Sequence, residues 1–324
     1  MYGLLVRATG DISVREEGTG GGVGAPRATP DGWLDGRRHV VLLVHGYNAD
    51  TDDARRSFDA FLRMLPARFP PAGRVYWPGD ADWGIFSAAS YPWKIPVARD
   101  AAGHLAGFVS KLRGPGGGPI ELTLVGHSLG CRVILELLED LSWLKATRAV
   151  VRVVVLMAAA VPHDLLEVGG LLRRSALGPL HRHVYFSDDD RILRFAFPVG
   201  QAAAQLLGME PGDSLEAVGL HGHPVSYPSR SRDLSGNRHS DYWKDRRAGG
   251  PPSRASSPHE PSHSGEGRVV GRKLFDWFML AVCVALVVLA LTRPLDTMRR
   301  TLITGASVFI GVRRAASLLS RDRV

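Results

Sequence analysis

Residues 124–130 read Leu-Val-Gly-His-Ser-Leu-Gly and set Ser128 between two glycines. The preceding residues, 120–125, form an apolar run of the length of a buried strand, and residues 129–144 carry apolar side chains at helical spacing. Where a strand turns this sharply into a helix, the backbone of the middle residue is strained and its side chain stands clear of the chain. The stretch therefore predicts a serine nucleophile at the carboxyl end of a strand.

The two flanking glycines, Gly126 and Gly130, fit this interpretation because larger side chains in a tight turn collide with neighbouring elements. The turn also directs the amide of Leu129, at the start of the helix, toward an oxyanion forming on a substrate. The alternative is a glycine–serine turn without chemistry, since the five-residue pattern alone also recurs by chance. The position of the motif between a strand and a helix favours the nucleophile.

The alternation of strand and helix extends along much of the chain. Strands are predicted at residues 39–44, 74–77, 120–125, 150–157 and 183–186, and helices at residues 51–65, 98–112 and 129–144. Strands that are apolar throughout and separated by helices are typical of a mostly parallel sheet with helices on both faces. The predicted fold class is therefore α/β. Its functional site is expected beyond the carboxyl ends of the strands, where His45, Ser128 and the acids after Phe186 lie.

Three segments have a weaker pattern. Residues 2–15 alternate weakly and are expected to form one or two edge strands, and residues 18–36, rich in Gly, Pro and Asp, predict a loop. Residues 81–96 are irregular and rich in aromatic side chains. The aromatic stretch from Trp77 to Trp93 suits either a lid or acyl-pocket wall, or ordinary core packing.

The composition is that of a globular protein with a core. The chain has 324 residues, of which 45% are hydrophobic and 22% charged. Its two cysteines, Cys131 and Cys283, fall in a predicted core helix and in a C-terminal apolar run, so we expect no stabilising disulfide. The first residues show no signal peptide, which predicts a cytoplasmic location for the folded part.

The C-terminal part differs from the rest. We predict a folded domain over residues 1–247, a flexible linker over 248–270 and a membrane-associating tail over 271–324. Residues 275–292 hold a single charge, Asp276, and a basic segment follows with seven arginines and two aspartates, which is +5 of the net +8. Such a tail favours an anionic membrane surface over nucleic acid. A single span, a shallow hairpin and an interfacial helix all remain open, as does a helix docked on the domain.

Three motifs together resemble the α/β-hydrolase superfamily: Val-His-Gly-Tyr-Asn at residues 44–48, Gly-His-Ser-Leu-Gly at 126–130 and His-Ser-Asp-Tyr-Trp at 239–243. Within the superfamily the chain is most similar to serine esterase- and lipase-like proteins classed as α/β hydrolases of unknown function. The resemblance covers residues 39–244. It implies a nucleophile, an acid and a histidine in that chain order, and an oxyanion hole built partly by the loop after the first central strand.

By this resemblance His45 and Gly46 form the histidine–glycine pair of that loop, and the amide of Tyr47 is the second oxyanion donor beside Leu129. The residues themselves allow the same interpretation, because Gly46 permits a sharp turn at a strand end. A strand that merely ends in glycine is the alternative. The pairing with the serine motif makes the oxyanion loop the favoured interpretation.

The acid is expected after the strand at residues 183–186, where Asp188, Asp189 and Asp190 follow one another. Relatives with a serine three residues before the acid, as Ser187 stands here, favour Asp190, with Asp188 as the second choice. Any of the three aspartates also suits a solvated turn or a helix cap.

Among the 12 histidines, chain order admits three candidates for the base: His221, His223 and His239. The resemblance to His-Ser-Asp-Tyr-Trp endings favours His239. His127, inside the serine motif, is expected to pack or hydrogen-bond beneath the site.

These residues predict a serine hydrolase, a carboxylesterase or lipase-like enzyme that uses Ser128, Asp190 and His239 on a small-molecule or lipid-like ester. An acyltransferase with the same three residues and a non-catalytic, membrane-tethered binding protein are the alternatives. We expect no cofactor and no metal, since the chain lacks nucleotide-binding glycine motifs and zinc-ligand spacing. The oligomeric state is left open.

Overall fold

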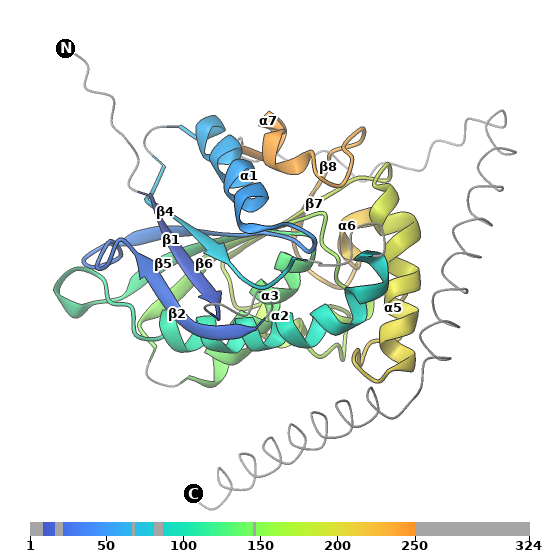
Figure 1. Ribbon diagram of the computed structural model, residues 1–324, viewed down its shortest axis with the longest axis horizontal. Helices are drawn as coiled ribbons and strands as arrows, with labels where there is room; N and C mark the ends of the chain where they lie inside the picture. The colour runs from blue at the N-terminus through green and yellow to red at the C-terminus, as the bar shows by residue number, and fades with distance from the viewer. Residues whose placement is uncertain (1–8, 17–21, 67–68, 81–86, 145–146, 250–324) are drawn as a thin grey trace, which may run out of the picture. The chain divides into compact units, whose positions relative to one another are not determined.

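The computed structural model describes residues 9–16, 22–66, 69–80, 87–144 and 147–249. Within them an eight-stranded sheet has the order β2-β1-β4-β3-β5-β6-β7-β8 (Figure 1). The strands are β1 Thr9–Arg15, β2 Val23–Thr29, β3 His39–Val44, β4 Ala72–Tyr76, β5 Ile120–His127, β6 Ala149–Met157, β7 His181–Phe186 and β8 Arg230–Asp233. β1 pairs antiparallel with β2, and all other neighbouring strands are parallel.

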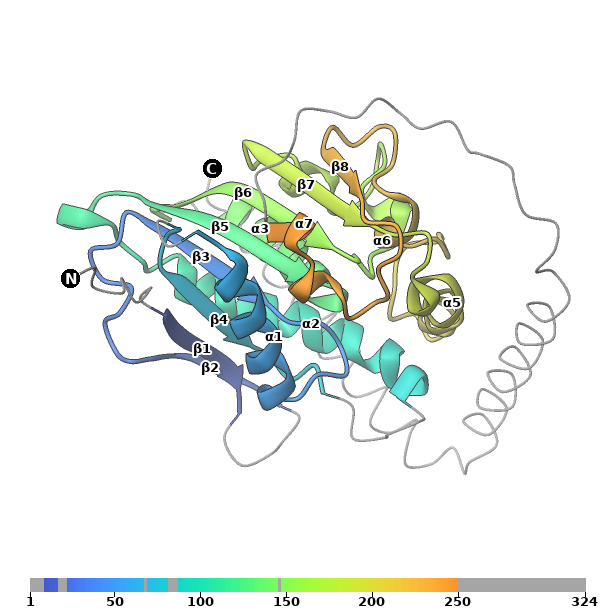
Figure 2. The same cartoon turned by 90° about the horizontal axis from the view of Figure 1, so that it is seen from above.

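The helices between the strands are α1 Thr51–Met64, α2 Ser87–Val109, α3 Leu129–Trp143, α4 Arg173–Ala176, α5 Phe197–Leu206, α6 Val218–His221 and α7 Arg246–Gly249. Shorter helical turns are η2 Pro115–Gly117, η3 His163–Leu165, the π-helix η4 Ile192–Ala196, and η5 Tyr242–Lys244. α1 and α7 lie on one face of the sheet, whereas α2 and α3 lie on the other (Figures 1 and 2). The predicted α/β class, mostly parallel with helices on both faces, is confirmed.

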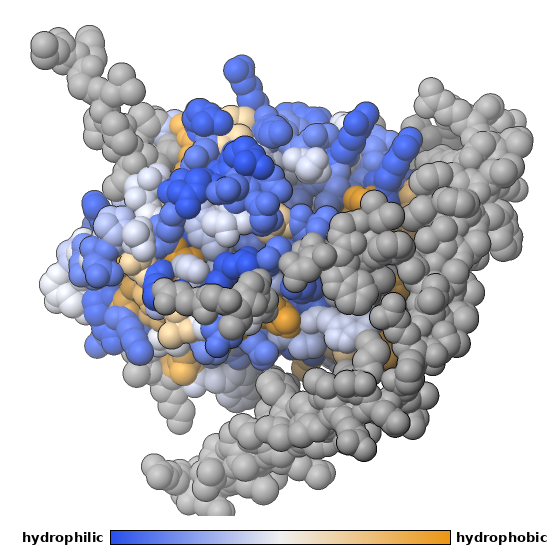
Figure 3. All heavy atoms as spheres, in the orientation of Figure 1, coloured by the Kyte–Doolittle hydropathy of each residue, from blue (hydrophilic) through white to orange (hydrophobic). Residues whose placement is uncertain are grey.

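Helix α1 is amphipathic, with an apolar side facing inward and a polar side facing outward. Asp50 caps the helix by accepting a hydrogen bond from the Asp53 amide at 2.7 Å, which satisfies one of its free N–H groups. Inward, Phe58 and Phe61 pack edge-on against Trp243, with ring centroids 5.2 and 5.4 Å apart. The outward surface over α1 is hydrophilic (Figure 3).

The register of the central strands brings their carboxyl ends together. Val44 of β3 pairs with Gly126 of β5, and Gly126 pairs with Leu156 of β6. β3 and β5 are buried along almost their whole length, as their apolar runs predict; Val40 to Val44, for example, are at most 1% exposed. β6, also expected to be apolar throughout, is buried mainly toward its carboxyl end, and its Val150 is 38% exposed. The residues that follow β3 and β5 therefore lie next to one another at one edge of the sheet.

Two sequence-based expectations are wrong. The segment predicted as a loop contains β2, which covers β1, so β1 is an interior strand and not an edge strand. Pro26 lies within β2, and an edge strand tolerates proline because its outward side needs no N–H donor. Helix α2 begins at Ser87 instead of residue 98 and continues through Pro92 and Pro96. Since proline removes a helical hydrogen bond, the sequence of this segment looks irregular although it is helical.

The folded part extends slightly beyond the predicted domain end at residue 247. The described residues reach 249, and Ala248 is buried in α7. The rest of the predicted linker and the whole tail, residues 271–324, lie outside the described residues. Within the described ranges, no helix has both the length and the apolar character that crossing a bilayer requires.

Candidate active site

Ser128 stands in a strained turn between β5 and α3. Its φ of +53° and ψ of −126° lie outside the regions that residues with a side chain normally adopt. Neighbouring backbone holds this conformation: the Ser128 amide donates to the Met157 carbonyl at 2.9 Å, and the Ser128 carbonyl accepts from the Ala160 amide at 3.2 Å. Strain of this kind costs free energy and persists only where the surroundings over-determine it.

The flanking glycines permit close packing of the turn. A Cβ atom on Gly126 would lie 2.7 Å from Cδ1 of Ile134, and one on Gly130 would lie 2.2 Å from the His45 carbonyl oxygen. The second distance is to backbone, which cannot swing aside. Glycine at these positions therefore lets α3 begin directly against the ends of β3 and β5.

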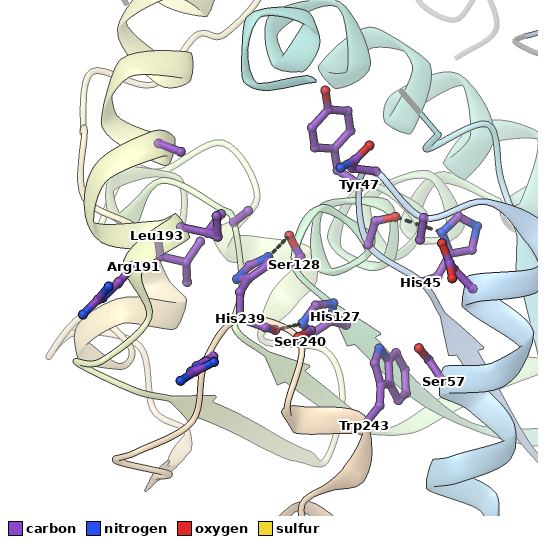
Figure 4. Close-up of a pocket in the computed structure, with 18 of the residues that line it drawn as sticks. His45, Tyr47, Ser57, His127, Ser128, Arg191, Leu193, His239, Ser240 and Trp243 are labelled. Carbon is purple, nitrogen blue, oxygen red and sulfur yellow. Dashed lines mark hydrogen bonds between the residues drawn. The ribbon is translucent and has the colours of Figure 1, made fainter. Parts of the chain in front are cut away.

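The structure brings Ser128, His239 and Asp190 together, and Figure 4 shows the first two of them. His239 Nε2 lies 2.9 Å from Ser128 Oγ, and His239 Nδ1 lies 2.7 Å from Asp190 Oδ2. Asp190 is fully buried, and its other oxygen accepts hydrogen bonds from the amides of Ile192 and Leu193, both at 3.1 Å. The carboxylate is thus fixed in orientation, and Nδ1–H of His239 donates to it while Nε2 accepts from the serine hydroxyl.

The three consecutive aspartates point to different partners. Asp188 accepts from His221 Nδ1 at 2.8 Å at the surface, and Asp189 accepts from the Gly236 amide at 2.9 Å. Only Asp190 of the three contacts His239. The favoured choice from the sequence thus has the geometry of a triad acid.

The two competing histidines are engaged elsewhere. His221 bonds to Asp188, and His223 Nδ1 donates to the Pro224 carbonyl at 2.7 Å. Neither bonds to the serine, whereas His239 does.

His127, next to the serine, holds the loop that carries His239. Its Nε2 donates to the His239 carbonyl oxygen at 2.6 Å, and the two rings lie 5.0 Å apart. Burial and the neighbouring His239 lower the pKa of His127 to about 3, so its ring is neutral at neutral pH. The sequence-based expectation that His127 hydrogen-bonds beneath the site agrees with this contact.

His45 fixes the loop on the other side of Ser128. Its Nδ1 donates to the Gly46 carbonyl at 2.8 Å, and its Nε2 accepts from the Trp77 amide at 3.2 Å. The indole N–H of Trp77 in turn donates to the His45 carbonyl at 2.8 Å. Burial lowers the pKa of His45 to about 4, which keeps the ring neutral and suited to this pair of hydrogen bonds.

The loop after β3 touches the serine directly. A Cβ atom on Gly46 would lie 2.9 Å from Cβ of Ser128, so the backbone that leads to the Tyr47 amide passes beside Ser128. The Tyr47 phenol is turned away from Ser128 and bonds to Ser90 Oγ at 2.6 Å (Figure 4). On the other side, Leu129 is the first residue of α3, where backbone N–H groups have no partner within the helix.

A cavity of about 980 Å³ opens onto Ser128. One apolar part of its lining comes from α2, the loop after β6, η4 and α5, namely Tyr91, Ala160, Ile192, Leu193, Ala196 and Phe197. Except for Tyr91, which lies in the segment considered as a pocket wall, sequence reasoning assigned no pocket role to these residues. The π-helix η4 is a local irregularity of the kind often found at functional sites. In the part of the chain that the structure describes, no group of His, Cys, Asp or Glu side chains is arranged to bind a metal.

A mostly parallel α/β sheet with a strained serine after a central strand, and a histidine and an aspartate hydrogen-bonded behind it, has the architecture of an α/β hydrolase. Residues 34–218 match the family described as alpha/beta hydrolase of unknown function (DUF900), and the chain belongs to this family. The matched residues include Ser128 and Asp190 and end before His239.

Similarity to other proteins is low. No curated protein matches the chain. Among solved structures, the Pyrobaculum calidifontis esterase is 12% identical over 78% of each chain, with a TM-score of 0.34. A protein from Agrobacterium vitis S4 described as a hydrolase is 13% identical over 62% of this chain and 81% of its own, with a TM-score of 0.32. The Tle1 effector bound to the VgrG spike of the Type 6 secretion system is 10% identical over 68% and 53%, with a TM-score of 0.30. Because these TM-scores are low, the assignment of the chain to its family rests on the match over residues 34–218.

Proposed function

We propose that the protein is a serine hydrolase that cleaves carboxylic esters through an acyl-enzyme on Ser128. The observation that carries the proposal is the continuous hydrogen-bonded chain from Ser128 Oγ through His239 to the buried Asp190, at 2.9 and 2.7 Å. A base within hydrogen-bond reach of the hydroxyl, oriented by a third group, is the arrangement that activates a serine.

In the proposed reaction, His239 Nε2 takes the hydroxyl proton as Ser128 Oγ attacks the ester carbonyl carbon. Asp190 accepts Nδ1–H throughout, which keeps the ring in the required tautomer and stabilises the imidazolium. The amides of Tyr47 and Leu129 donate to the oxyanion. His239 then protonates the leaving alcohol, and water, deprotonated by the same imidazole, cleaves the acyl-enzyme and releases the acid.

The first experiment compares hydrolysis of 4-nitrophenyl butyrate by the wild type, by Ser128→Ala and by Ser142→Ala. Ser142 lies on the same helix α3, exposed, with its hydroxyl on the Glu139 carbonyl. Loss of turnover in Ser128→Ala alone supports the proposal. Equal turnover in all three proteins contradicts it. Product analysis with an added alcohol separates hydrolysis from acyl transfer, because transfer converts the acyl group into a new ester.

We also propose that residues 271–324 hold the enzyme at a membrane, with the catalytic domain in the cytoplasm. The support is in the sequence alone: the 18 residues 275–292 hold one charge, and the arginine-rich segment follows them. Sedimentation of the full chain with membranes, and its resistance to extraction by carbonate, test this proposal. Recovery in the soluble fraction contradicts it.

A further inference from the structure

The mouth of the active-site cavity is lined by cationic side chains from separate elements. Arg56 comes from α1, Arg191 follows β7, Arg238 follows β8, and Lys244 is in η5. All four side chains are exposed to solvent. Positive groups from four places in the sequence thus converge on one opening.

Only part of this charge is neutralised. Arg56 forms an ion pair with Asp53, the nearer of the two acidic residues that line the cavity. The other acid, Asp189, is held by the Gly236 amide at 2.9 Å. Within the described ranges, the side chains of Arg191, Arg238 and Lys244 form no ion pair, so the described lining has a surplus of two positive charges. Such a surplus concentrates anions at an opening.

Another part of the same cavity lining is apolar. Tyr91 and Phe197 pack edge to face with their centroids 5.9 Å apart, and a Cβ atom on Gly200 would lie 2.8 Å from the Tyr91 ring, so α5 presses against this wall. Ile192 lines the cavity although 50% of its surface is exposed, whereas Leu193 beside it is buried. An exposed isoleucine at a cavity wall offers apolar surface to a bound chain.

The charges and the apolar wall are next to the reacting groups. Arg238 directly precedes His239, and Arg191 directly follows Asp190 and precedes Ile192. In Figure 4 the guanidinium of Arg191 is directed away from Ser128, and Leu193 lines the same cavity as Ser128 and His239. An ester whose carbonyl carbon lies at Ser128 Oγ therefore has both cationic groups and apolar side chains within the same cavity.

Resting on the proposed esterase function, we propose that the substrate is an amphiphilic ester with an apolar acyl chain and an anionic group on its alcohol part. The acyl chain packs on the wall formed by Tyr91, Ile192, Leu193 and Phe197, and the anion lies among Arg191, Arg238 and Lys244. A cavity of about 980 Å³ has room for such a ligand. The bond that breaks is the ester C–O bond: the acyl group passes to Ser128 Oγ and then to water, and the anionic alcohol leaves with a proton from His239.

The test uses two octanoyl esters that differ in one charge: that of 3-hydroxy-4-nitrobenzoate, which is anionic, and that of its methyl ester, which is neutral. Each kcat/KM is divided by the rate of spontaneous hydrolysis to remove differences between the leaving groups. The wild type is expected to prefer the anionic ester by about tenfold at low salt, and the preference shrinks toward one at about 1 M salt. A triple variant, Arg191→Gln, Arg238→Gln and Lys244→Gln, is expected to lose the preference.

Arg174→Gln is the matched control, because Arg174 is exposed on α4 and does not line the cavity. The apolar wall has its own pair: Ile192→Ser is expected to lower the octanoyl-over-acetyl preference by about fivefold, and Leu206→Ser, exposed outside the cavity, leaves it unchanged. Hydrolysis of the neutral ester with no preference for the anion, or a preference that survives the triple variant, overturns the substrate class alone. Absence of hydrolysis of both esters overturns the proposed esterase function and this inference with it.

Discussion

His127 and His239, 112 positions apart in the chain, are joined by a hydrogen bond of 2.6 Å from a ring nitrogen of the first to the carbonyl oxygen of the second. The residue directly before Ser128 thereby holds the backbone of the histidine that bonds to the Ser128 hydroxyl. Because His127 acts on the backbone of His239 through this hydrogen bond, we infer that it is a positioning residue.

Replacing His127 with alanine is expected to lower kcat for 4-nitrophenyl butyrate by about tenfold, because small displacements of a reacting group are costly. The unpaired carbonyl also lowers the free energy of unfolding by about 1–3 kcal/mol. His127→Gln, whose amide can donate to the same carbonyl, is expected to recover part of kcat. His104→Ala, an exposed change on α2, is the control. A stability loss without any change in kcat shows instead that His127 is only structural.

The buried histidines also make the folded state sensitive to acid. The pKa values of His45 and His127 fall from 6.5 to about 4 and about 3 on folding, so below pH 6.5 the unfolded chain binds protons that the folded chain does not. Their contribution to the free energy of unfolding is then largest above pH 6.5 and decreases as the pH falls toward 4. Each histidine contributes a slope of about 1.4 kcal/mol per pH unit. Urea unfolding at pH 7, 6 and 5 measures it, and His127→Gln is expected to show the smaller slope. An equal slope in both proteins contradicts the assignment.

The three aspartates after β7 offer an internal comparison. Asp190→Asn is expected to lower kcat by about 10³–10⁴, because an amide no longer holds His239 in the required tautomer. Asp188→Asn, which removes only a surface contact with His221, is expected to change kcat by less than about twofold. Steady-state rates of the two variants on one ester are compared, and circular dichroism verifies that both variants are folded. A larger loss in Asp188→Asn contradicts the geometry.

Gly46 is expected to tolerate no side chain. In Gly46→Ala the new methyl group meets Cβ of Ser128 at 2.9 Å, which displaces either the nucleophile or the loop that carries the Tyr47 amide. We expect kcat/KM to fall by about 10². Gly107→Ala is the matched control: it is in α2, and no atom lies within 4 Å of its new methyl group, so it is expected to leave kcat/KM unchanged and to raise stability by about 0.5–1 kcal/mol. A Gly46→Ala enzyme with unchanged rates argues against this loop as an oxyanion donor.

The part of the fold that the sequence predicts well is governed by local pattern. The turn at Ser128 and the apolar central strands were predictable because strand, glycine turn and helix are encoded within about twenty residues. β2 and the first part of α2 were not, since Pro26, Pro92 and Pro96 disfavour strand and helix locally and tertiary packing overrides that preference.

The site residues also fall into those that local pattern predicts and those that tertiary packing sets. The sequence narrows the acid to residues 188–190, but which of them faces His239 depends on the loop at residues 236–239, far along the chain. The apolar cavity wall was missed for a related reason. The side of α5 that lines the cavity is fixed by the packing of Phe197 on Tyr91, a contact between distant parts of the chain that the sequence periodicity does not reveal.

The most direct test of the central claim, that Ser128 is activated by His239, is fluorophosphonate labelling of the full chain followed by peptide mapping. We expect a single phosphonyl adduct on Ser128, and labelling of His239→Ala slower by about 10³. An adduct on another residue, labelling that survives Ser128→Ala, or a folded wild type that takes up no probe would contradict the account.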